Sequence, residues 1–511
     1  MPPESTLYRS GRIYRRTDSA ATAMLVRGER IEWVGGEAEA DELAPARVVD
    51  LQHALVTPAF VDAHVHCTST GLAMTGLDLR PAASLADALR LVGEAARGAR
   101  GRPLLGSGWD ETAWPEHRAP TAAELDRASY GGVVYLARVD KHSAVASSAL
   151  MAVVPALANQ HGFRSDGWLR GPAHDAVRVA AHEALSTAQR TSAHRATLRR
   201  AAELGIACVH EMAGPVISSA DDLLTLQRLA REEPGPEVIG YWAELNGTGT
   251  ARELGAVGAA GDLFCDGSLG SHTAALAEPY ADQPDSSGTL RYGTGEIAEH
   301  IAQCLDAGLQ FGFHAIGDAA IEQILDAVDT VGARFGRAAG IGHRIEHAEF
   351  VRDPTRLAAS GLTASMQPRF DELWGGAHGM YAQRLGRARA NQLNRFADLA
   401  AAGVPLAFGS DAPVTELGPW AAVAAAVHPH DSSAGLATDD AFAAHTIGGW
   451  RAAGRLDAGT LAPGTVATFA VWDVIGRDAR LPHLQTGMPA CLATVRAGQP
   501  IYEDPAWSGG L

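Results

Sequence analysis

The stretch FVDAHVHCTSTG, residues 60–71, has two histidines where an apolar run ends. The run is typical of a buried β-strand, and His64 and His66 lie at its end. Imidazole nitrogens in such a place are candidate ligands for a divalent metal. Two histidines in this spacing also occur where a strand simply meets solvent. The rest of the chain has to decide between the two interpretations.

Composition restricts the class of protein. A chain of 511 residues that is 46% hydrophobic can bury one large core and a smaller one. The net charge of −17 argues against nucleic acid or an anionic membrane as a partner. We find no apolar run long enough to span a bilayer and no signal-peptide segment in residues 1–18. The five cysteines are far apart in the sequence, which suits free thiols in a reducing cytoplasm. We expect a cytoplasmic protein with a small-molecule substrate, and the sequence is compatible with a homodimer.

The two ends of the chain are alike, since both contain short β-type runs separated by glycine turns. Neither end has enough strand to close a sheet alone. Residues 1–57 and 461–511 are therefore expected to form one composite β-sandwich domain. Residues 58–67 and 187–460 form the predicted barrel. Residues 68–186 are too many for one crossover, so we expect an inserted α+β segment that caps the barrel mouth.

Short apolar runs alternate with helical segments through the middle of the chain. The predicted strands are residues 59–66, 206–211, 238–245, 262–266, 310–314, 342–347, 362–366 and 405–411. Helical patterns lie between them, for example at 194–205, 296–308, 319–335 and 394–403, and several end on a glycine as a helix C-cap. Strand then helix, eight times, is typical of a (β/α)8 TIM barrel of the α/β class.

Polar residues at the ends of these strands form one constellation. In such a barrel, active-site residues lie at the C-terminal ends of the strands. Four histidines and one aspartate occupy these ends: His64, His66, His314, His347 and Asp411. Imidazole and carboxylate groups are the ligands of ions such as Zn²⁺. A chance placement of all five is improbable with 20 histidines in 511 residues, so the metal-ligand interpretation of His64 and His66 is favoured.

Longer motifs carry a resemblance to a known family. The segments PAFVDAHVH, FHAIGD, RIEHAE and FGSDAPV resemble the metal motifs of the amidohydrolase superfamily. The segments GSGWDETAWPEHRAPT, CDGSLGSHTAAL and SMQP resemble its YtcJ-like branch, also called the amidohydrolase 3 family. The resemblance covers nearly the whole chain.

The resemblance implies that the five strand-end residues bind a divalent metal, with Zn²⁺ as the expected ion. It also implies that Asp411 is the base that takes a proton from a metal-activated water, which attacks a carbonyl carbon. Asp411 and His347 are the predicted catalytic residues. The expected reaction is hydrolysis of a non-peptide carbon–nitrogen bond, with an N-acyl or N-formyl amine as the natural substrate.

One position departs from the family pattern. Relatives in this branch usually carry a lysine on the fourth strand, where carboxylation lets it bridge two metals. This chain reads GDLFCDGS there and places Asp262 at the lysine position, and its only lysine is Lys141. Asp262 could bridge two metals although its side chain is shorter, or the site could hold one metal, or metal binding could be lost. We favour one metal, with Asp262 included among the ligands.

Four further residues are candidates for substrate binding: Trp109, Asp110, His142 and Asp266. The first three lie in the insertion, and a Trp wall with a polar neighbour suits an amphipathic substrate. Trp109 could equally belong to the core of the insertion, and Asp266 could instead organise the glycine-rich turn after it. We expect Arg344 and Glu346 to form an internal ion pair beside His347.

Two other functions compete with amide hydrolysis. The first is a deaminase of a heterocycle with a single metal, but only Asp318 is available as the acid that such enzymes need after the fifth strand. The second is a non-catalytic homologue that binds a metabolite or protein. Metal content distinguishes the two enzyme classes from the binding protein.

Overall fold

The computed structural model of the chain describes residues 5–16, 21–111, 114–139, 141, 143–336, 339–474 and 480–510. Its centre is an eight-stranded sheet in which each strand pairs in parallel with the next. In spatial order the strands are β7 (Phe60–Val65), β13 (Ile206–Ala213), β14 (Glu237–Trp242), β15 (Gly258–Ala259), β16 (Gln310–Ala315), β17 (Arg344–His347), β18 (Thr363–Met366) and β19 (Leu406–Phe408). The predicted (β/α)8 barrel is confirmed.

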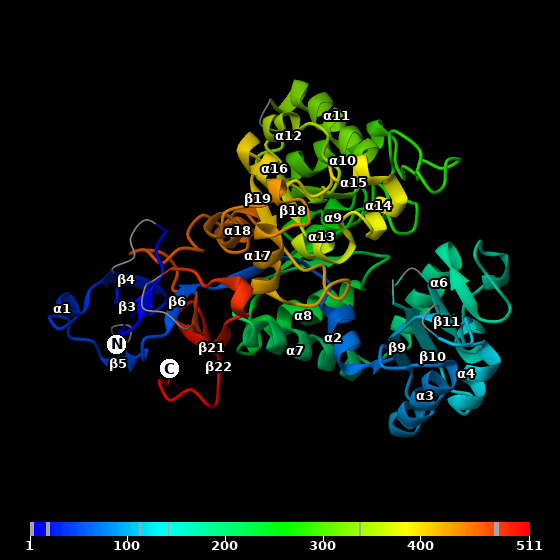
Figure 1. Ribbon diagram of the computed structural model, residues 1–511, viewed down its shortest axis with the longest axis horizontal. Coiled ribbons are helices and arrows are strands. Elements are labelled where there is room, and N and C mark those ends of the chain that lie inside the picture. Colours follow the sequence, from blue (N-terminus) through cyan, green and yellow to red (C-terminus); the bar gives the residue numbers. More distant parts are fainter. Residues whose placement is uncertain are drawn as a thin grey trace.

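Helices connect these strands and surround the sheet (Figure 1). They are α7 (Thr187–Glu203), α8 (Ala220–Glu232), α9 (Thr248–Glu253), α10 (Thr294–Ala307), α11 (Asp318–Phe335), α12 (Pro354–Ser360), α13 (Pro368–Trp374), α14 (Met380–Leu385), α15 (Arg387–Ala390), α16 (Phe396–Ala402), α17 (Pro419–Val427), α18 (Thr438–Ala444) and α19 (Ile447–Ala452). The helix α10 ends where the sequence predicts, because Gly308 adopts the left-handed conformation with φ of 64°.

The fourth strand is shorter and begins earlier than the predicted range 262–266. It covers only Gly258–Ala259, and a single bridge between Phe264 and His314 continues the pairing. The reason is Gly261, whose φ of 94° takes the chain out of the extended conformation. Asp262 therefore lies beyond the strand, in the connection to α10.

The eighth strand ends at Phe408 rather than at the predicted residue 411. Asp411 lies in the following loop with φ of 53°, and its backbone N–H donates to the carbonyl oxygen of His64 at 2.8 Å. Ala412 also forms a parallel bridge with Val65. These contacts connect the last strand to the first at the end of the barrel where the candidate ligands lie.

Both ends of the chain contribute to one sheet. The order is β2 (Arg12–Ile13), β6 (Leu55–Pro58), β20 (Phe469–Asp473), β21 (Ala490–Arg496) and β22 (Gln499–Glu503). A four-stranded sheet contains β4 (Arg30–Gly35), β3 (Ala23–Arg27), β1 (Ser5–Arg9) and β5 (Arg47–Asp50), and the short helix α1 (Glu37–Ala40) follows β4. Buried side chains of the two sheets, such as Met24 and Phe469, share one core.

The chain between β7 and β13 forms a separate sheet beside the barrel, to which α2 leads (Figure 1). Its elements are α2 (Cys67–Thr75), β8 (Leu77–Asp78), α3 (Leu85–Ala99), β9 (Leu104–Trp109), α4 (Ala122–Ala128), β10 (Val134–Arg138), β11 (Ser143–Ala146), α5 (Ser148–Met151), β12 (Trp168–Arg170) and α6 (Gly171–Glu183). Arg80 pairs with Glu416 at 3.1 Å, and Arg178 donates to the Val216 carbonyl at 3.2 Å. The insertion thus contacts the connections that follow β13 and β19.

All five cysteines of the sequence are buried and unpaired, as predicted. Within the described ranges, none of the helices combines the length and the apolar character needed to cross a membrane.

Candidate metal centre

Four histidines and two aspartates meet at the C-terminal ends of the barrel strands. They form two groups that share one residue, and the ligand atoms within each group lie within 4.8 Å of one another. The first group contains His64, His66, Asp262 and Asp411, and the second contains Asp262, His314 and His347. The structure thus brings together all six residues for which the sequence predicts metal binding.

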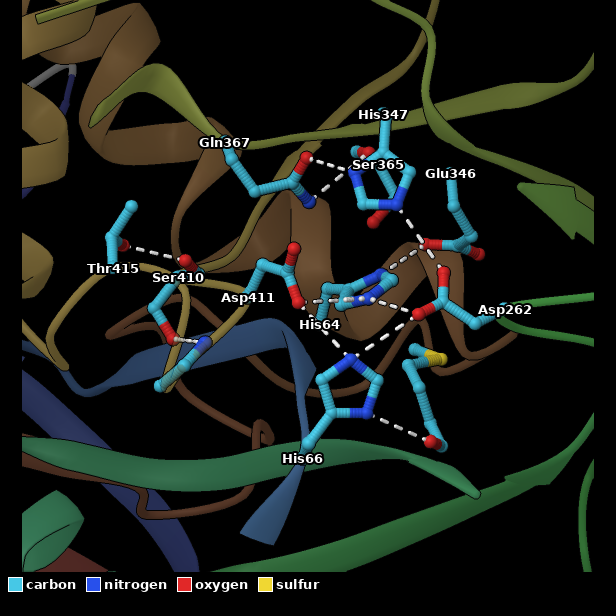
Figure 2. A network of polar contacts seen from close by, with 12 residues as sticks. His64, His66, Asp262, Glu346, His347, Ser365, Gln367, Ser410, Asp411 and Thr415 are labelled. Atoms are coloured by element: carbon cyan, nitrogen blue, oxygen red, sulfur yellow. Dashed lines mark hydrogen bonds and ion pairs between the residues drawn. The ribbon is translucent and has the colours of Figure 1, made fainter. Parts of the chain in front are cut away.

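The distances in the first group match those between ligands of one ion. The Nε2 atom of His66 lies 3.2 Å from Asp262 Oδ2 and 3.1 Å from Asp411 Oδ1. The Nε2 atom of His64 lies 3.5 and 3.6 Å from the same two oxygens. Ligand atoms about 2.0–2.1 Å from a tetrahedral ion are about 3.3–3.4 Å apart. The four histidine–aspartate distances, 3.1 to 3.6 Å, are close to that spacing (Figure 2).

Asp262 lies between the two groups. Its Oδ2 atom faces His64 and His66, whereas its Oδ1 atom lies 3.3 Å from Nε2 of His347. One carboxylate therefore offers a different oxygen to each group.

Two atoms of the first group lack a hydrogen-bond partner among the described residues. Nε2 of His64 and Oδ1 of Asp411 are buried, and neither has a partner among the described residues. A buried polar atom without a partner is costly, and such atoms in native proteins need an explanation. A divalent cation bound here would satisfy both atoms. The residues present therefore fit a divalent metal.

In three of the histidines Nδ1 is held by an acceptor, which leaves Nε2 for the centre. The acceptors are Glu346 Oε2 for His64 (2.9 Å), the Met212 carbonyl for His66 (3.0 Å) and Gln367 Oε1 for His347 (2.7 Å), whereas Nδ1 of His314 lies 3.3 Å from Asp266 Oδ1 without a hydrogen bond. Such partners fix the tautomer and the ring orientation of metal-binding histidines. The rings are thus oriented for metal binding by the protein itself.

Glu346 is fixed in turn by a buried arginine. Arg344 is fully buried, and its guanidinium donates to both oxygens of Glu346, to the Ala63 carbonyl and to Ser365 Oγ. Burial raises the pKa of the Glu346 carboxyl, but the charge of Arg344 and the hydrogen bond from His64 lower it to about 2. Glu346 therefore stays ionised, and its Oε2 atom accepts the hydrogen bond from Nδ1 of His64. The internal ion pair expected from the sequence has this positioning function.

The centre concentrates negative charge. Burial lowers the pKa of His64, whereas Asp262, Glu346 and Asp411 raise it, to about 10. The surplus of carboxylates thus favours a cationic occupant, either protons on the imidazoles or a metal ion.

The loop after β19 holds Asp411 in place. Asp411 has a positive φ, and the residues around it are tied together: Ala412 N–H donates to Ser410 Oγ at 3.0 Å, and Thr415 Oγ1 donates to the Ser410 carbonyl at 2.6 Å (Figure 2). His347 also has a positive φ, of 70°. Positive φ values at residues other than glycine cluster at functional sites, where the surrounding structure has to hold them.

Asp266 acts on the centre indirectly. Its carboxylate is fully buried and accepts hydrogen bonds from the backbone N–H groups of Ala275, Ile316 and Gly317. The same carboxylate lies against Nδ1 of His314. Asp266 thus organises the adjacent loops and places a negative charge beside the candidate ligand His314.

The other substrate-binding candidates lie in the insertion. Trp109 is fully buried against Trp114, and its indole N–H donates to the Leu136 carbonyl at 2.8 Å. Asp110 pairs with Arg138 at 3.0 Å. Trp109 therefore has the core position that the sequence left open as an alternative. His142 lies outside the described residues.

Sequence reasoning missed two positioning contacts and two aromatic contacts. It did not connect Glu346 with His64, or Gln367 with His347, because these partners are far apart along the chain. Phe370 stacks on His347 with ring centres 6.1 Å apart, and Phe264 lies 4.9 Å from His314. For Phe264, the signal in the sequence was its spacing of two residues from Asp262 and from Asp266, which places all three on one face of an extended segment.

Comparison with known proteins gives a consistent result. A model of the amidohydrolase family matches residues 47–502. The chain is 27% identical to the putative amidohydrolase YtcJ of Bacillus subtilis, over 78% of this chain and 77% of that protein. It is 24% identical to the N-substituted formamide deformylase of Arthrobacter pascens, over 94% of this chain and 96% of that enzyme.

A solved structure is similar over nearly its whole length. It is an uncharacterized metal-dependent hydrolase from Pyrococcus horikoshii OT3, with a TM-score of 0.79, 26% identity, and coverage of 97% of this chain and all of that one. The family match spans most of the sequence, and the cluster of histidines and aspartates provides the ligands that such a hydrolase needs. The chain is therefore a metal-dependent hydrolase of the amidohydrolase family.

Proposed function

We propose that this enzyme hydrolyses the carbon–nitrogen bond of small N-formyl or N-acyl amines, with two divalent metal ions, Zn²⁺ being the expected ion. The observation that carries the proposal is the geometry of Asp411. Its Oδ1 atom is buried, lacks a hydrogen-bond partner among the described residues, and lies 3.1 Å from Nε2 of His66. A carboxylate in that place can serve both as a ligand and as a base.

Divalent ions held at the centre by these residues would lower the pKa of a water molecule and polarise the substrate carbonyl. Asp411 accepts the proton of this water and returns it to the departing amine nitrogen, so that it acts first as general base and then as general acid. Its loop is fixed by the hydrogen bond to the His64 carbonyl, which keeps the carboxylate in position between these two steps.

The position of Asp262 supports two metal ions. From the sequence we favoured one metal because this side chain is shorter than a carboxylated lysine. Its two oxygens nevertheless face the two ligand groups, at 3.2 Å from His66 and 3.3 Å from His347. We therefore revise the expectation to two ions, with Asp262 in the bridging position. His64, His66 and Asp411 would hold one ion, and His314 and His347 the other.

The comparisons support the substrate class. The formamide deformylase matches this chain over almost its whole length, and its name states that it acts on N-substituted formamides. Formamides and related N-acyl amines have the carbonyl carbon and the amine leaving group that this arrangement requires.

Deamination is less well supported by the position of Asp318. Its Oδ1 atom accepts the backbone N–H groups of Ala277 and Ala319, and Arg352 lies 3.6 Å from its other oxygen. These contacts occupy the carboxylate at the start of α11. It is therefore a poor candidate for the acid that protonates a heterocycle.

A combined metal analysis and substrate screen tests the proposal. The protein is purified without chelators, its metal content is measured, and it is assayed with N-formyl amines, N-acyl amines, lactams and amino-heterocycles. We expect two metal ions per chain and release of amine from the formyl or acyl compounds. Protein without metal, or ammonia release from the heterocycles alone, contradicts the proposal.

A further inference from the structure

Arg291 lies near the metal centre and has no acidic partner among the described residues. The guanidinium of Arg291 lies over the ring of Phe264, with 4.9 Å from Cζ to the ring centre. The ring of Phe264 in turn lies 4.9 Å from the ring of His314. Two direct contacts thus connect the positive charge to a candidate metal ligand.

The backbone that carries Arg291 is anchored on both sides. Its own N–H donates to the Cys265 carbonyl at 2.8 Å, and the carbonyl of the next residue, Tyr292, accepts a hydrogen bond from Gln323 at 2.9 Å. The segment belongs to the connection from β15 to α10, on the side of the barrel where the ligands lie. These hydrogen bonds therefore fix the backbone of Arg291 at the rim of the site.

Three other arginines in the connections of this face pair with acidic residues. Arg352 lies 3.6 Å from Asp318, Arg369 lies 2.9 Å from Glu372, and Arg384 lies 2.5 Å from Asp282. For Arg291, no carboxylate of the described residues comes within the 4.0 Å of an ion pair, although acidic residues outnumber basic ones by 59 to 42 in the sequence. Its guanidinium thus keeps its hydrogen-bond donors available to a ligand.

We propose that Arg291 binds a carboxylate of the substrate, so that the preferred substrates are N-formyl or N-acyl amino acids rather than neutral amines. This proposal rests on the proposed function and specifies its substrate class. A guanidinium binds a carboxylate through two parallel hydrogen bonds, and its stacking on Phe264 restricts its orientation. Phe264 is only partly buried, and its ring contacts both this cation and His314.

Binding of a matched pair of compounds tests the proposal. N-formyl-L-phenylalanine and N-formylphenethylamine differ only in the carboxylate. Their dissociation constants are measured by calorimetry with metal-loaded Asp411→Asn protein, in which turnover is strongly slowed. We expect the acid to bind about tenfold more tightly than the amine.

The preference should disappear when Arg291→Met is added, while the affinity for the neutral compound stays within about twofold. Arg352→Met is the matched control, because it removes an exposed cation from the same face, and it should keep the preference. Equal binding of the two compounds, or a preference that survives Arg291→Met, overturns the proposal. The second result would mean that the carboxylate binds the metal centre directly.

Turnover by the unmodified enzyme keeps the two proposals separate. If neither compound is hydrolysed, formamide hydrolysis is contradicted, whereas the binding measurements still decide the role of Arg291. If the neutral compound is hydrolysed at least as efficiently as the acid, in kcat/KM, the function stands and the Arg291 proposal is wrong.

Discussion

Glu346 accepts a hydrogen bond from Nδ1 of His64 at 2.9 Å, and Arg344 donates to both oxygens of the same carboxylate. All three side chains are buried. The orientation of a metal ligand therefore depends on an ion pair in the barrel interior. The substitution Glu346→Gln keeps the shape but removes the charge. We expect metal affinity to fall by about 10–100-fold, because ring orientation and basicity of His64 are both affected.

The same variant should also be less stable, by about 3–5 kcal/mol, because Arg344 stays buried without its counter-charge. Chelator competition measures the affinity, and urea unfolding of the metal-free protein measures the stability. Glu233→Gln is the control, since Glu233 pairs with Arg195 at the surface and should change neither quantity. Unchanged metal affinity in Glu346→Gln would show that Glu346 does not position His64.

The substitution Asp411→Asn tests the base. The amide cannot accept the proton, so kcat should fall by about 10²–10⁴-fold while the protein still folds. The comparison is made at equal metal content, because Asp411 is also a candidate ligand. Asp318→Asn is the matched variant on the same face and should keep most of the activity. Full activity in Asp411→Asn refutes the assigned base, and a larger loss in Asp318→Asn would favour deamination.

The bridging role of Asp262 predicts a change in metal stoichiometry. The Asp262→Ala protein should retain one metal ion or fewer per chain, compared with two before the substitution, because both ligand groups lose an oxygen. Elemental analysis after gel filtration gives the count. The metal content of the unmodified protein should not depend on bicarbonate, because Lys141 is the only lysine of the sequence and lies in the insertion. If Asp262→Ala keeps the full count, Asp262 is not a ligand.

Trp109 distinguishes packing from substrate binding. Trp109→Phe loses the hydrogen bond to the Leu136 carbonyl and part of the contact with Trp114. We expect a loss of about 1–3 kcal/mol in the stability of the insertion, with KM unchanged. Limited proteolysis and steady-state kinetics on the same preparation measure the two effects. A raised KM without loss of stability would show that Trp109 contributes to substrate binding.

His343 predicts a dependence of stability on pH. It stacks on Phe311 at the start of β17, and its Nδ1 atom accepts the Phe311 N–H at 2.9 Å. Burial lowers its pKa to about 4, from about 6.5 in the unfolded chain. The unfolded state therefore binds the proton first, and this contribution to stability is complete above pH 6.5 and is lost as the pH falls toward 4.

The variant His343→Asn keeps an acceptor near the same place but does not titrate. Its melting temperature should fall less between pH 6.5 and 4.5 than that of the unmodified protein. Identical slopes would mean that His343 does not contribute to the acid sensitivity.

The sequence by itself determined the barrel and five of the candidate ligands. Strand alternation and the end positions of His64, His66, His314, His347 and Asp411 are local features, and a parallel barrel necessarily gathers the C-terminal ends of its strands. The lysine-to-aspartate change in the fourth connection was also visible in the sequence. Its consequence was not, because strand β15 stops at Ala259 and Gly261 redirects the chain before Asp262.

Only the tertiary structure decided which atoms face one another. The two oxygens of Asp262 face different ligand groups, Glu346 holds His64, and Arg291 lies on Phe264. Trp109 is buried because side chains from other parts of the insertion pack around its indole. The sequence pattern gives the face of each strand, whereas contacts between distant residues depend on how loops close and side chains pack, which no local periodicity encodes.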